Sequence, residues 1–304
     1  MAPSSEPLVP SKLAAAQPLA SWSQVCIVGL GLIGGSLARA LRRHLPALRL
    51  VGIERAAALP QLPADLVDAA IAEHDAAAVD AALAGSELIC IATPVGSIPA
   101  WLERALRHPG VVTDCGSSKR GIASAARALP ERRRFVPGHP MAGAGADRSA
   151  LAAELYEGRS WLLCPEQSDP VAVDAVERLV TRIGAKPVRI GADAHDRAVA
   201  LTSHAPRLVA SVLMALAEQA GALDAAGPAF ERITRGAGGS LEMWRDILGS
   251  NSDEIARALR LLMRELEACA VELEGARVDR NLSTLAAAER AREKFDIQRR
   301  RPAG

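Results

Sequence analysis

The sequence lacks a strong charge of either sign, clustered cysteines and long uninterrupted apolar runs. Its 36 basic and 35 acidic residues leave a formal net charge of +1, which gives no basis for binding to nucleic acid or to an anionic membrane surface. No uninterrupted apolar run reaches the ~20 residues that a membrane-spanning helix needs. The five cysteines are scattered without a C-x-x-C pair, so we expect free thiols, no structural metal site and a reducing, cytoplasmic location.

The most informative stretch is Val25–Ser36, in which a short apolar run precedes three glycines and the small and apolar residues of a helix. Gly29, Gly31 and Gly34 have the G-x-G-x-x-G spacing of a dinucleotide-binding turn. Gly29 permits the tight turn, Gly31 lets a pyrophosphate approach the backbone, and Gly34 brings the helix close to the strand. The N–H groups at the start of the helix then face the phosphates.

A second apolar run, 48–53, ends in Glu54, 20 positions beyond Gly34. An acid at this distance accepts hydrogen bonds from the adenosine ribose, and its charge repels a 2′-phosphate, which favours NAD over NADP. Arg55 weakens that preference, because an arginine can pair with the extra phosphate. The alternative is a plain glycine turn beside a surface glutamate. The predicted cofactor contacts also include residues at the helix start and after a later strand: Leu32, Ile33, Thr93 and Pro94.

The pattern divides the chain into four parts. Residues 1–21 are rich in Ala, Pro and Ser, lack the features of a secretory signal, and are predicted to be a disordered extension. Residues 22–192 alternate between strand and helix, which predicts an α/β domain with a Rossmann-type, doubly wound, mostly parallel sheet. Residues 193–298 show helical periodicity without strand signals and predict an all-α domain. Residues 299–304 are expected to be a frayed tail.

The expected elements of the α/β domain follow the same alternation. After the two strands around the glycine turn, strands are predicted at 87–92, 111–113, 135–138, 161–164 and 186–190. Helices are predicted at 76–84, 98–106, 120–129 and 171–183 in this domain, and at 193–222, 241–248, 252–274 and 282–294 in the next, with a break at Gly227-Pro228. Several strands then end at one edge of a parallel sheet, which is where ligands bind in such folds.

His139 is the first candidate for chemistry. It stands at the end of the predicted strand 135–138, where a neutral imidazole can take a proton from a hydroxyl while hydride leaves the same carbon. A buried structural histidine is the alternative. Ser117 follows the neighbouring strand and can hydrogen-bond His139 and fix its tautomer, or it can cap the helix that follows.

Two further candidates lie in the helical domain. His204 precedes Pro206, which is expected to kink or break the helix, and polar groups beside such a break often face a cleft. Arg235 stands beside flexible glycines and is a candidate carboxylate clamp. Surface or packing roles are the alternatives for both residues.

Eight short motifs stand in the order and spacing of one known family. They are Gly-Leu-Gly-Leu-Ile-Gly-Gly-Ser36, Ala92-Thr-Pro-Val95, Asp114-x-Gly-Ser-x-Lys119, His139-Pro-Met-Ala-Gly143, His195-Asp-Arg197, Ser203-His-x-Pro206, Thr234-Arg235 and Met243-Trp-x-Asp-Ile247. On these motifs the chain resembles the prephenate/arogenate dehydrogenase family, from about residue 24 to residue 270. Each motif alone is modest, whereas eight in order are specific.

The resemblance implies a homodimer in which each chain has a Rossmann domain and a helical dimerisation domain. It implies an NAD-dependent prephenate dehydrogenase of tyrosine biosynthesis, which converts prephenate to 4-hydroxyphenylpyruvate by oxidative decarboxylation. Hydride would pass from C4 to NAD while His139 accepts the C4 hydroxyl proton, with Ser117 orienting the imidazole. Arg235 would bind a substrate carboxylate and His204 would line the pocket. A dianionic substrate favours a second cation, for which Arg207 is the candidate.

Two departures from the family pattern leave alternatives open. The family often has histidine at the position of Arg207, near the substrate side chain, so prephenate and arogenate both remain candidate substrates. Arg235-Gly-Ala-Gly-Gly239 replaces the usual Arg-Ile-Ala-x-Ser, which predicts a more flexible clamp and keeps a non-catalytic NAD-binding regulator as a further alternative. The β-hydroxyacid dehydrogenases share this layout but place a catalytic lysine in the helical part, and residues 187–293 contain no lysine.

Overall fold

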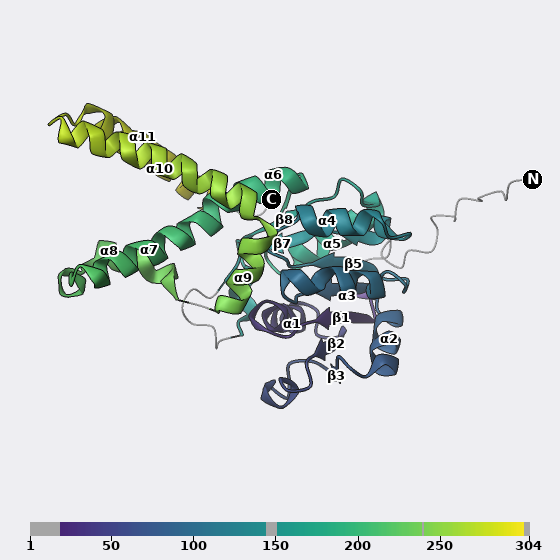
Figure 1. Ribbon diagram of the computed structural model, residues 1–304. Coiled ribbons are helices and arrows are strands. Elements are labelled where there is room, and N and C mark those ends of the chain that lie inside the picture. Colours follow the sequence, from purple (N-terminus) through teal and green to yellow (C-terminus); the bar gives the residue numbers. More distant parts are fainter. Residues whose placement is uncertain (1–18, 144–150, 239, 301–304) are drawn as a thin grey trace, which may run out of the picture. The chain divides into compact units, whose positions relative to one another are not determined.

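The structure is a computed structural model that describes residues 19–143, 151–238 and 240–300 (Figure 1). The chain forms two compact units, which divide between Gly191 and Ala192 and are called unit 1 and unit 2. Of the predicted extension 1–21, only the last three residues are described, and they form a 3-10 turn, Leu19–Ser21, rather than disordered chain. Of the predicted tail 299–304, the first two residues belong to α11 (Asp279–Arg300), and the remainder lies outside the described residues.

Unit 1 is built on a six-stranded sheet in which every pairing is parallel. Its strands are β1 (Gln24–Val28), β2 (Arg49–Glu54), β3 (Ala69–Ala72), β4 (Leu88–Ile91), β5 (Val111–Asp114) and β6 (Phe135–Val136). Their order, β3-β2-β1-β4-β5-β6, is that of a Rossmann sheet, so the predicted fold class is confirmed. The order reverses between β1 and β4, and the crevice at their carboxyl ends is where such sheets bind ligands.

Helices cover both faces of this sheet (Figure 1). One face packs against α1 (Leu32–His44) and α5 (Pro170–Arg182), and the other against α2 (Ala76–Ala84), α3 (Ile98–Ala105) and α4 (Arg120–Arg127). Because alternate residues of a strand point to opposite faces, β1 sends Val25 and Ile27 into one core and Cys26 and Val28 into the other. The strands are therefore buried on both sides, as their continuous apolar runs predict.

A second, smaller sheet in unit 1 corrects the prediction for residues 135–138. The predicted single strand is split at Pro137, and β7 (Gly138–Pro140) joins β8 (Ser160–Leu163) and β9 (Lys186–Arg189) in a separate sheet. β7 pairs antiparallel with β8, and β8 pairs parallel with β9. Pro137 has no N–H with which to continue the parallel ladder. His139 therefore lies in the middle of β7 instead of at the end of a strand of the main sheet.

Unit 2 is helical in its described residues, as predicted. Its helices are α6 (Ala192–Val199), α7 (Ala205–Gln219), α8 (Pro228–Thr234), α9 (Leu241–Ser250), α10 (Ser252–Glu274) and α11. The expected break at Gly227-Pro228 is present, since α7 ends at Gln219 and α8 begins at Pro228, where proline is well accommodated in the first turn of a helix. Between α6 and α7 the helix continues through a π-helical turn, Ala200–His204.

The helix that runs through α6 and α7 bears on the expectation that the chain has no membrane span. It covers 28 residues, Ala192–Gln219, and its most apolar part has a mean hydropathy of 1.4, which is enough in length and composition to cross a membrane. It also carries His195, Asp196 and His204, whose side chains are buried within the protein. The part of the helix that bears these side chains packs against α10, whereas only 28% of the most apolar part is buried.

Candidate active site

The glycine loop after β1 has the geometry that the sequence predicts. Gly29 has a φ of +89°, and its N–H donates to the Ile53 carbonyl at 2.8 Å. A Cβ at Gly34 would lie 1.8 Å from the Gly29 carbonyl oxygen, so only glycine lets α1 approach the turn this closely. A Cβ at Gly31 would instead point into open space.

The open side of the loop is suited to a phosphate group. α1 begins at Leu32, directly after Gly31. Because glycine has no side chain, the N-cap position leaves the first N–H groups of the helix uncapped. These N–H groups carry the positive end of the helix dipole, and a pyrophosphate can reach them because Gly31 has no side chain. Leu32 and Ile33 are the first two residues of α1, so the structure places both predicted contacts at this end of the helix.

Glu54 ends β2 beside the glycine loop. Its carboxylate accepts hydrogen bonds from the N–H of Leu30 at 2.7 Å and from the N–H of Arg55 at 2.8 Å. A carboxylate has about four acceptor positions, so ribose hydroxyls can bond to those that remain. The Arg55 side chain is 73% exposed, and its Nε lies 3.8 Å from Glu54 Oε1.

Thr93 and Pro94 follow β4 on the other side of the same crevice. The Ala92 carbonyl oxygen and the Thr93 methyl group are the atoms that a Cβ on Gly29 would meet, at 2.8 and 3.1 Å. Ser97 donates to Thr93 Oγ1 at 2.9 Å and so helps to fix that side chain. The predicted cofactor residues thus converge at the carboxyl ends of β1, β2 and β4.

Alanine substitutions at Gly31 and Gly34 should separate cofactor binding from folding. We expect Gly34→Ala to lower the unfolding free energy by about 1–3 kcal/mol, because the added methyl group overlaps a backbone oxygen. Gly31→Ala should unfold like the unchanged protein but bind NAD⁺ about 10-fold more weakly, a loss of about 1.4 kcal/mol. Thermal unfolding and calorimetric titration with NAD⁺ measure the two effects. Unchanged NAD⁺ affinity in Gly31→Ala would show that the pyrophosphate does not lie against this loop.

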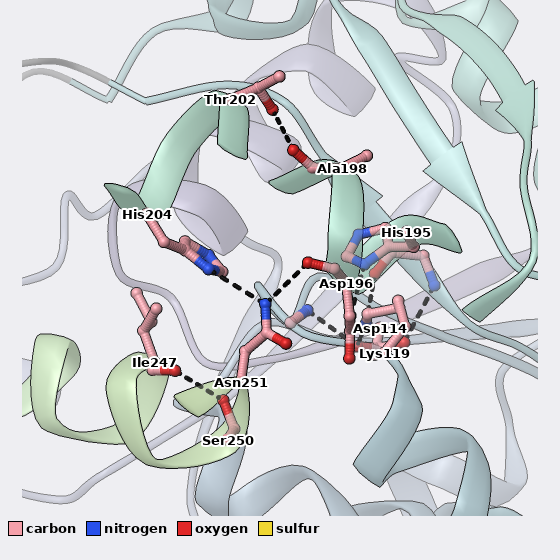
Figure 2. Close-up of polar contacts among 12 residues, drawn as sticks. Asp114, Lys119, His195, Asp196, Ala198, Thr202, His204, Ile247, Ser250 and Asn251 are labelled. Carbon is pink, nitrogen blue, oxygen red and sulfur yellow. Dashed lines mark hydrogen bonds and ion pairs between the residues drawn. The ribbon is translucent and has the colours of Figure 1, made fainter. Parts of the chain in front are cut away.

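A fully buried ion pair connects the end of β5 to the start of β7. The Lys119 ammonium forms an ion pair with the Asp114 carboxylate, and neither side chain is exposed (Figure 2). Asp114 Oδ1 accepts the Gly138 N–H at 3.0 Å, while Lys119 Nζ donates to the Gly138 carbonyl at 2.7 Å. Asp114 Oδ2 also accepts the Gly116 N–H at 2.8 Å. Both backbone groups of Gly138 are therefore held by one charged pair.

This clamp fixes the backbone position of His139, which is the next residue. A Cβ on Gly138 would lie 2.7 Å from the Asp114 carbonyl oxygen and 2.8 Å from the Trp161 indole nitrogen, so the strand can approach β5 only with glycine here. His139 is 9% exposed and pairs with Leu162 of β8. Its Cα is thus held at the carboxyl edge of β5, although it belongs to the second sheet.

Ser117 lies in the loop between β5 and α4 and is half-buried. The alternative role as a helix cap finds no support, because α4 begins after Lys119 without a side-chain cap. Ser117 and His139 both lie close in sequence to residues of the clamp. The hydrogen bond between their side chains stays a prediction.

In unit 2, the break expected at Pro206 takes the form of the π-helical turn. Since proline has no N–H, it leaves a preceding carbonyl without its usual helical partner. A π-helical turn, in which the helix is locally wider, is one way to accommodate this. His204 is the last residue of this turn and is 1% exposed. Its Nδ1 lies 3.4 Å from the Asn251 amide nitrogen, which donates to the Asp196 carbonyl at 2.9 Å (Figure 2).

Arg207 lies one turn after His204, and both contact Trp244 of α9. The Arg207 guanidinium stacks over the indole at 5.4 Å from the ring centre, and the His204 ring meets the indole edge-on at 6.2 Å. Three buried polar atoms of this cluster have no hydrogen-bond partner among the described residues: His204 Nε2, Arg207 Nη1 and Asn251 Oδ1. Unsatisfied buried polar atoms are uncommon and often mark a ligand site.

The third predicted substrate residue, Arg235, lies outside this cluster of contacts. It starts a 3-10 turn, Arg235–Ala237, that follows α8 and packs against α7, and its side chain is exposed. Gly239, at the end of the predicted flexible loop, lies outside the described residues. Unit 2 thus holds all three candidate substrate residues, whereas unit 1 holds His139, Ser117 and the cofactor residues.

Burial lowers the pKa of His204 from 6.5 to about 4, with the Asp196 carboxylate opposing and His195 reinforcing the shift. The unfolded chain therefore binds this proton more readily than the folded chain, and stability falls as the pH drops from 6.5 towards 4. At 1.36 kcal/mol per pKa unit the effect on the unfolding free energy is at most about 3.4 kcal/mol. We expect His204→Gln to flatten this part of the curve of unfolding free energy against pH, measured in urea. The exposed His74, changed to Gln, is the control and should leave the slope unchanged.

Sequence reasoning missed two features of the site. The buried ion pair of Asp114 and Lys119 was not predicted, although a lysine near an acid beside a buried strand is a signal for such a pair. No role was predicted for Trp244, which stacks on Arg207, or for Asn251, which contacts His204. These contacts join distant parts of the chain, and no local pattern in the sequence predicts them.

Comparison with known proteins gives one assignment over both units. The family model for the prephenate dehydrogenase nucleotide-binding domain matches residues 37–189, and that for the prephenate dehydrogenase dimerization domain matches residues 191–287. The prephenate dehydrogenase of Bacillus subtilis is 34% identical over 259 residues, which cover 80% of this chain and 68% of that protein. The cyclohexadienyl dehydrogenase of Zymomonas mobilis is 25% identical over 259 residues, which cover 81% of this chain and 87% of that protein.

Two solved structures are similar over almost their whole length. Arogenate dehydrogenase from Synechocystis has a TM-score of 0.70 at 26% identity, covering 90% of this chain and 99% of that one. Prephenate dehydrogenase from Aquifex aeolicus, solved with hydroxyphenyl propionate and NAD⁺, has a TM-score of 0.77 at 24% identity with the same coverage, a likeness of fold. The matches to both family models and to the Bacillus enzyme show that the chain belongs to the prephenate dehydrogenase family of NAD-dependent oxidoreductases, as the sequence predicts.

Proposed function

We propose that this chain converts prephenate to 4-hydroxyphenylpyruvate by NAD-dependent oxidative decarboxylation, a step towards tyrosine. The observation that carries the proposal is the buried His139, whose neighbour Gly138 is clamped to the end of β5 at the sheet edge that also bears the glycine loop. The Bacillus relative is named a prephenate dehydrogenase, and the Aquifex structure contains NAD⁺ and a hydroxyphenyl compound. Both names agree with this chemistry.

In the proposed reaction, His139 first accepts and later returns a proton. Prephenate carries a hydroxyl and a hydrogen on ring carbon C4, and two carboxylates, one on C1 of the ring and one on the side chain. NAD⁺, when bound, supplies the acceptor for the C4 hydride. His139 takes the C4 hydroxyl proton as the C4–O bond becomes a carbonyl, with Ser117 orienting the imidazole. The bond from C1 to its carboxylate then breaks, CO₂ leaves, and the electron pair reaches the C4 oxygen, which takes its proton back from His139.

The cofactor would be held by the loop that starts at Gly29, with its pyrophosphate against Gly31 and the start of α1. Glu54 would accept hydrogen bonds from the adenosine ribose, and its negative charge would disfavour a 2′-phosphate. We therefore propose NAD over NADP. Arg55, which is largely exposed and lies 3.8 Å from Glu54, can still pair with a 2′-phosphate and so weakens this preference without reversing it.

The substrate carboxylates would be bound from unit 2. We propose that Arg235 binds one of them, since an exposed guanidinium can form a bidentate pair with a carboxylate. Arg207 would provide the second cation, and the neutral His204 would line the pocket. Arogenate is the second candidate substrate, because the Synechocystis neighbour is named an arogenate dehydrogenase and the Zymomonas relative a cyclohexadienyl dehydrogenase.

We also propose that the enzyme acts as a homodimer in the cytoplasm. Unit 2 matches the family's dimerization domain and exposes large apolar side chains on α7, α10 and α11 that a partner could cover. They include Val212, Leu216, Leu261, Met263, Leu266, Leu282 and Leu285. The five cysteines are free thiols, as expected for a reducing compartment.

The test is formation of NADH, followed at 340 nm, after the purified chain and NAD⁺ are mixed with prephenate or, separately, with arogenate. Turnover of prephenate, with 4-hydroxyphenylpyruvate and CO₂ as products, supports the proposal. Turnover of arogenate alone would replace it with the second candidate. Intact NAD⁺ binding without turnover of either compound would overturn it.

A further inference from the structure

Arg207 is held in a way that leaves part of its guanidinium without a hydrogen-bond partner among the residues that the structure describes. Its guanidinium carbon lies over the Trp244 indole, 5.4 Å from the ring centre, a cation–π contact that restrains the side chain. Nη1 is buried and has no hydrogen-bond acceptor among the described residues. Arg207 is half-buried, and this partial burial lowers the pKa of its guanidinium. A desolvated N–H without an acceptor is unfavourable unless a ligand provides one.

A second unsatisfied atom lies on the same side of the helix. His204 precedes Arg207 by three positions, so the two side chains lie on one face. Both contact the same indole, and His204 Nε2 is buried without a partner among the described residues. The imidazole is neutral at physiological pH, since its pKa lies near 4. The cluster therefore presents one fixed cation beside one neutral imidazole.

We infer that Arg207, braced by Trp244, selects a substrate side chain that ends in a 2-oxo acid over one that ends in a 2-ammonio acid. The inference rests on the proposed function and names prephenate, not arogenate, as the compound that this site favours. A 2-oxo carboxylate offers a keto oxygen and a carboxylate oxygen as adjacent acceptors, which match the paired N–H groups of a guanidinium. The ammonium of arogenate offers only donors at the same place and carries the same charge as Arg207.

Histidine, which the family often has at this position, would not discriminate in this way. A neutral imidazole can accept from an ammonium or donate to a keto oxygen, whereas a guanidinium has donors only. The stacking on Trp244 makes the discrimination sharper, because it limits the freedom of the long arginine side chain to turn away from an unfavourable ligand.

The test compares kcat/KM for prephenate and for arogenate in the full-length enzyme and in Arg207→Gln. Loss of charge-assisted hydrogen bonds to the keto acid should lower the value for prephenate by about 10- to 100-fold. The value for arogenate should fall much less or rise, so that the ratio of the two changes by at least about 10-fold. Arg207→His should shift the ratio in the same direction. Arg245→Gln, an exposed arginine next to Trp244, is the matched control and should leave the ratio unchanged.

Two outcomes would overturn the inference. Equal losses of kcat/KM for both substrates would mean that Arg207 binds only the carboxylate that they share. Unchanged kcat/KM for both substrates would mean that Arg207 does not contact the substrate side chain. If the unaltered enzyme turned over neither substrate, the proposed function itself would fail, which is a distinct result.

Stability and product binding provide measurements that do not depend on turnover. Because Arg207 Nη1 has no acceptor among the described residues, Arg207→Gln loses only the contact with Trp244 and should unfold within about 4 °C of the unaltered protein. Calorimetric titration in the presence of NADH should show that the substitution lowers the affinity for 4-hydroxyphenylpyruvate, a 2-oxo acid, more than the affinity for L-tyrosine, its 2-ammonio counterpart. Clear destabilisation with equal losses for both ligands would assign Arg207 a merely structural role.

Discussion

His139→Asn is expected to lower kcat for prephenate by about 10²- to 10⁴-fold, the range that removal of a general base usually gives. Asparagine is similar in size and can still form hydrogen bonds, but it cannot take up a proton at neutral pH. The loss should appear in kcat more than in KM, because the proton moves in the transition state and not on binding. Initial rates of NADH formation measure it.

The affinity for NAD⁺ should stay the same, since the glycine loop and Glu54 are unaltered. The matched control is His74→Asn, which removes an exposed histidine from unit 1 and should leave kcat unchanged. A fall of less than about 5-fold in His139→Asn would show that another group takes the proton. In that case a buried structural histidine, the alternative that the sequence leaves open, becomes the better interpretation.

The parts of the fold that depend on neighbouring residues could be predicted from the sequence. Gly29 and Gly34 are glycines for local reasons, and their spacing carries that information. Gly29 has a φ of +89°, and a Cβ on Gly34 would lie 1.8 Å from a backbone oxygen. Continuous apolar runs likewise predict strands buried on both faces. β3 escaped prediction because its residues, Ala-Ala-Ile-Ala, have weak strand propensity and acquire their conformation from pairing with β2.

The features that depend on distant contacts could not be predicted in this way. Residues 135–140 look like one strand, and only the pairing of β7 with β8 shows that they belong to two sheets. Pro206 signals a break in the helix, but not that the helix passes through a π-helical turn that buries His204. The stacking of Arg207 on Trp244 depends on how α7 and α9 pack, which periodicity within either helix does not determine.

The buried pair of Asp114 and Lys119 should have the largest effect on stability. Asp114→Asn leaves an ammonium fully buried without its carboxylate, and Lys119→Met leaves a fully buried carboxylate without its ammonium. Breaking such a pair from one side costs about 3–5 kcal/mol of unfolding free energy. Urea unfolding, followed through the fluorescence of the buried Trp22 and Trp161, measures this loss for each single variant.

The double variant, Asp114→Asn with Lys119→Met, distinguishes the charge effect from the clamp on Gly138. With no uncompensated charge left, its stability should recover most of what either single variant loses, so the two losses should be far from additive. The ion pair of Arg107 and Glu103, which is exposed on α3 and the turn after it, is the control, and its removal should cost less than about 0.5 kcal/mol. Additive losses would show that the two residues act independently.

Catalysis in the double variant should not recover with stability. The Gly138 carbonyl loses the donor that Lys119 provides, so the backbone before His139 is held through one hydrogen bond instead of two. Since a general base must stay within hydrogen-bond reach of its proton, kcat should remain depressed while NAD⁺ affinity is normal. A double variant that is both stable and fully active would show that the ion pair serves folding alone, and that β7 keeps His139 in place through its pairing with β8.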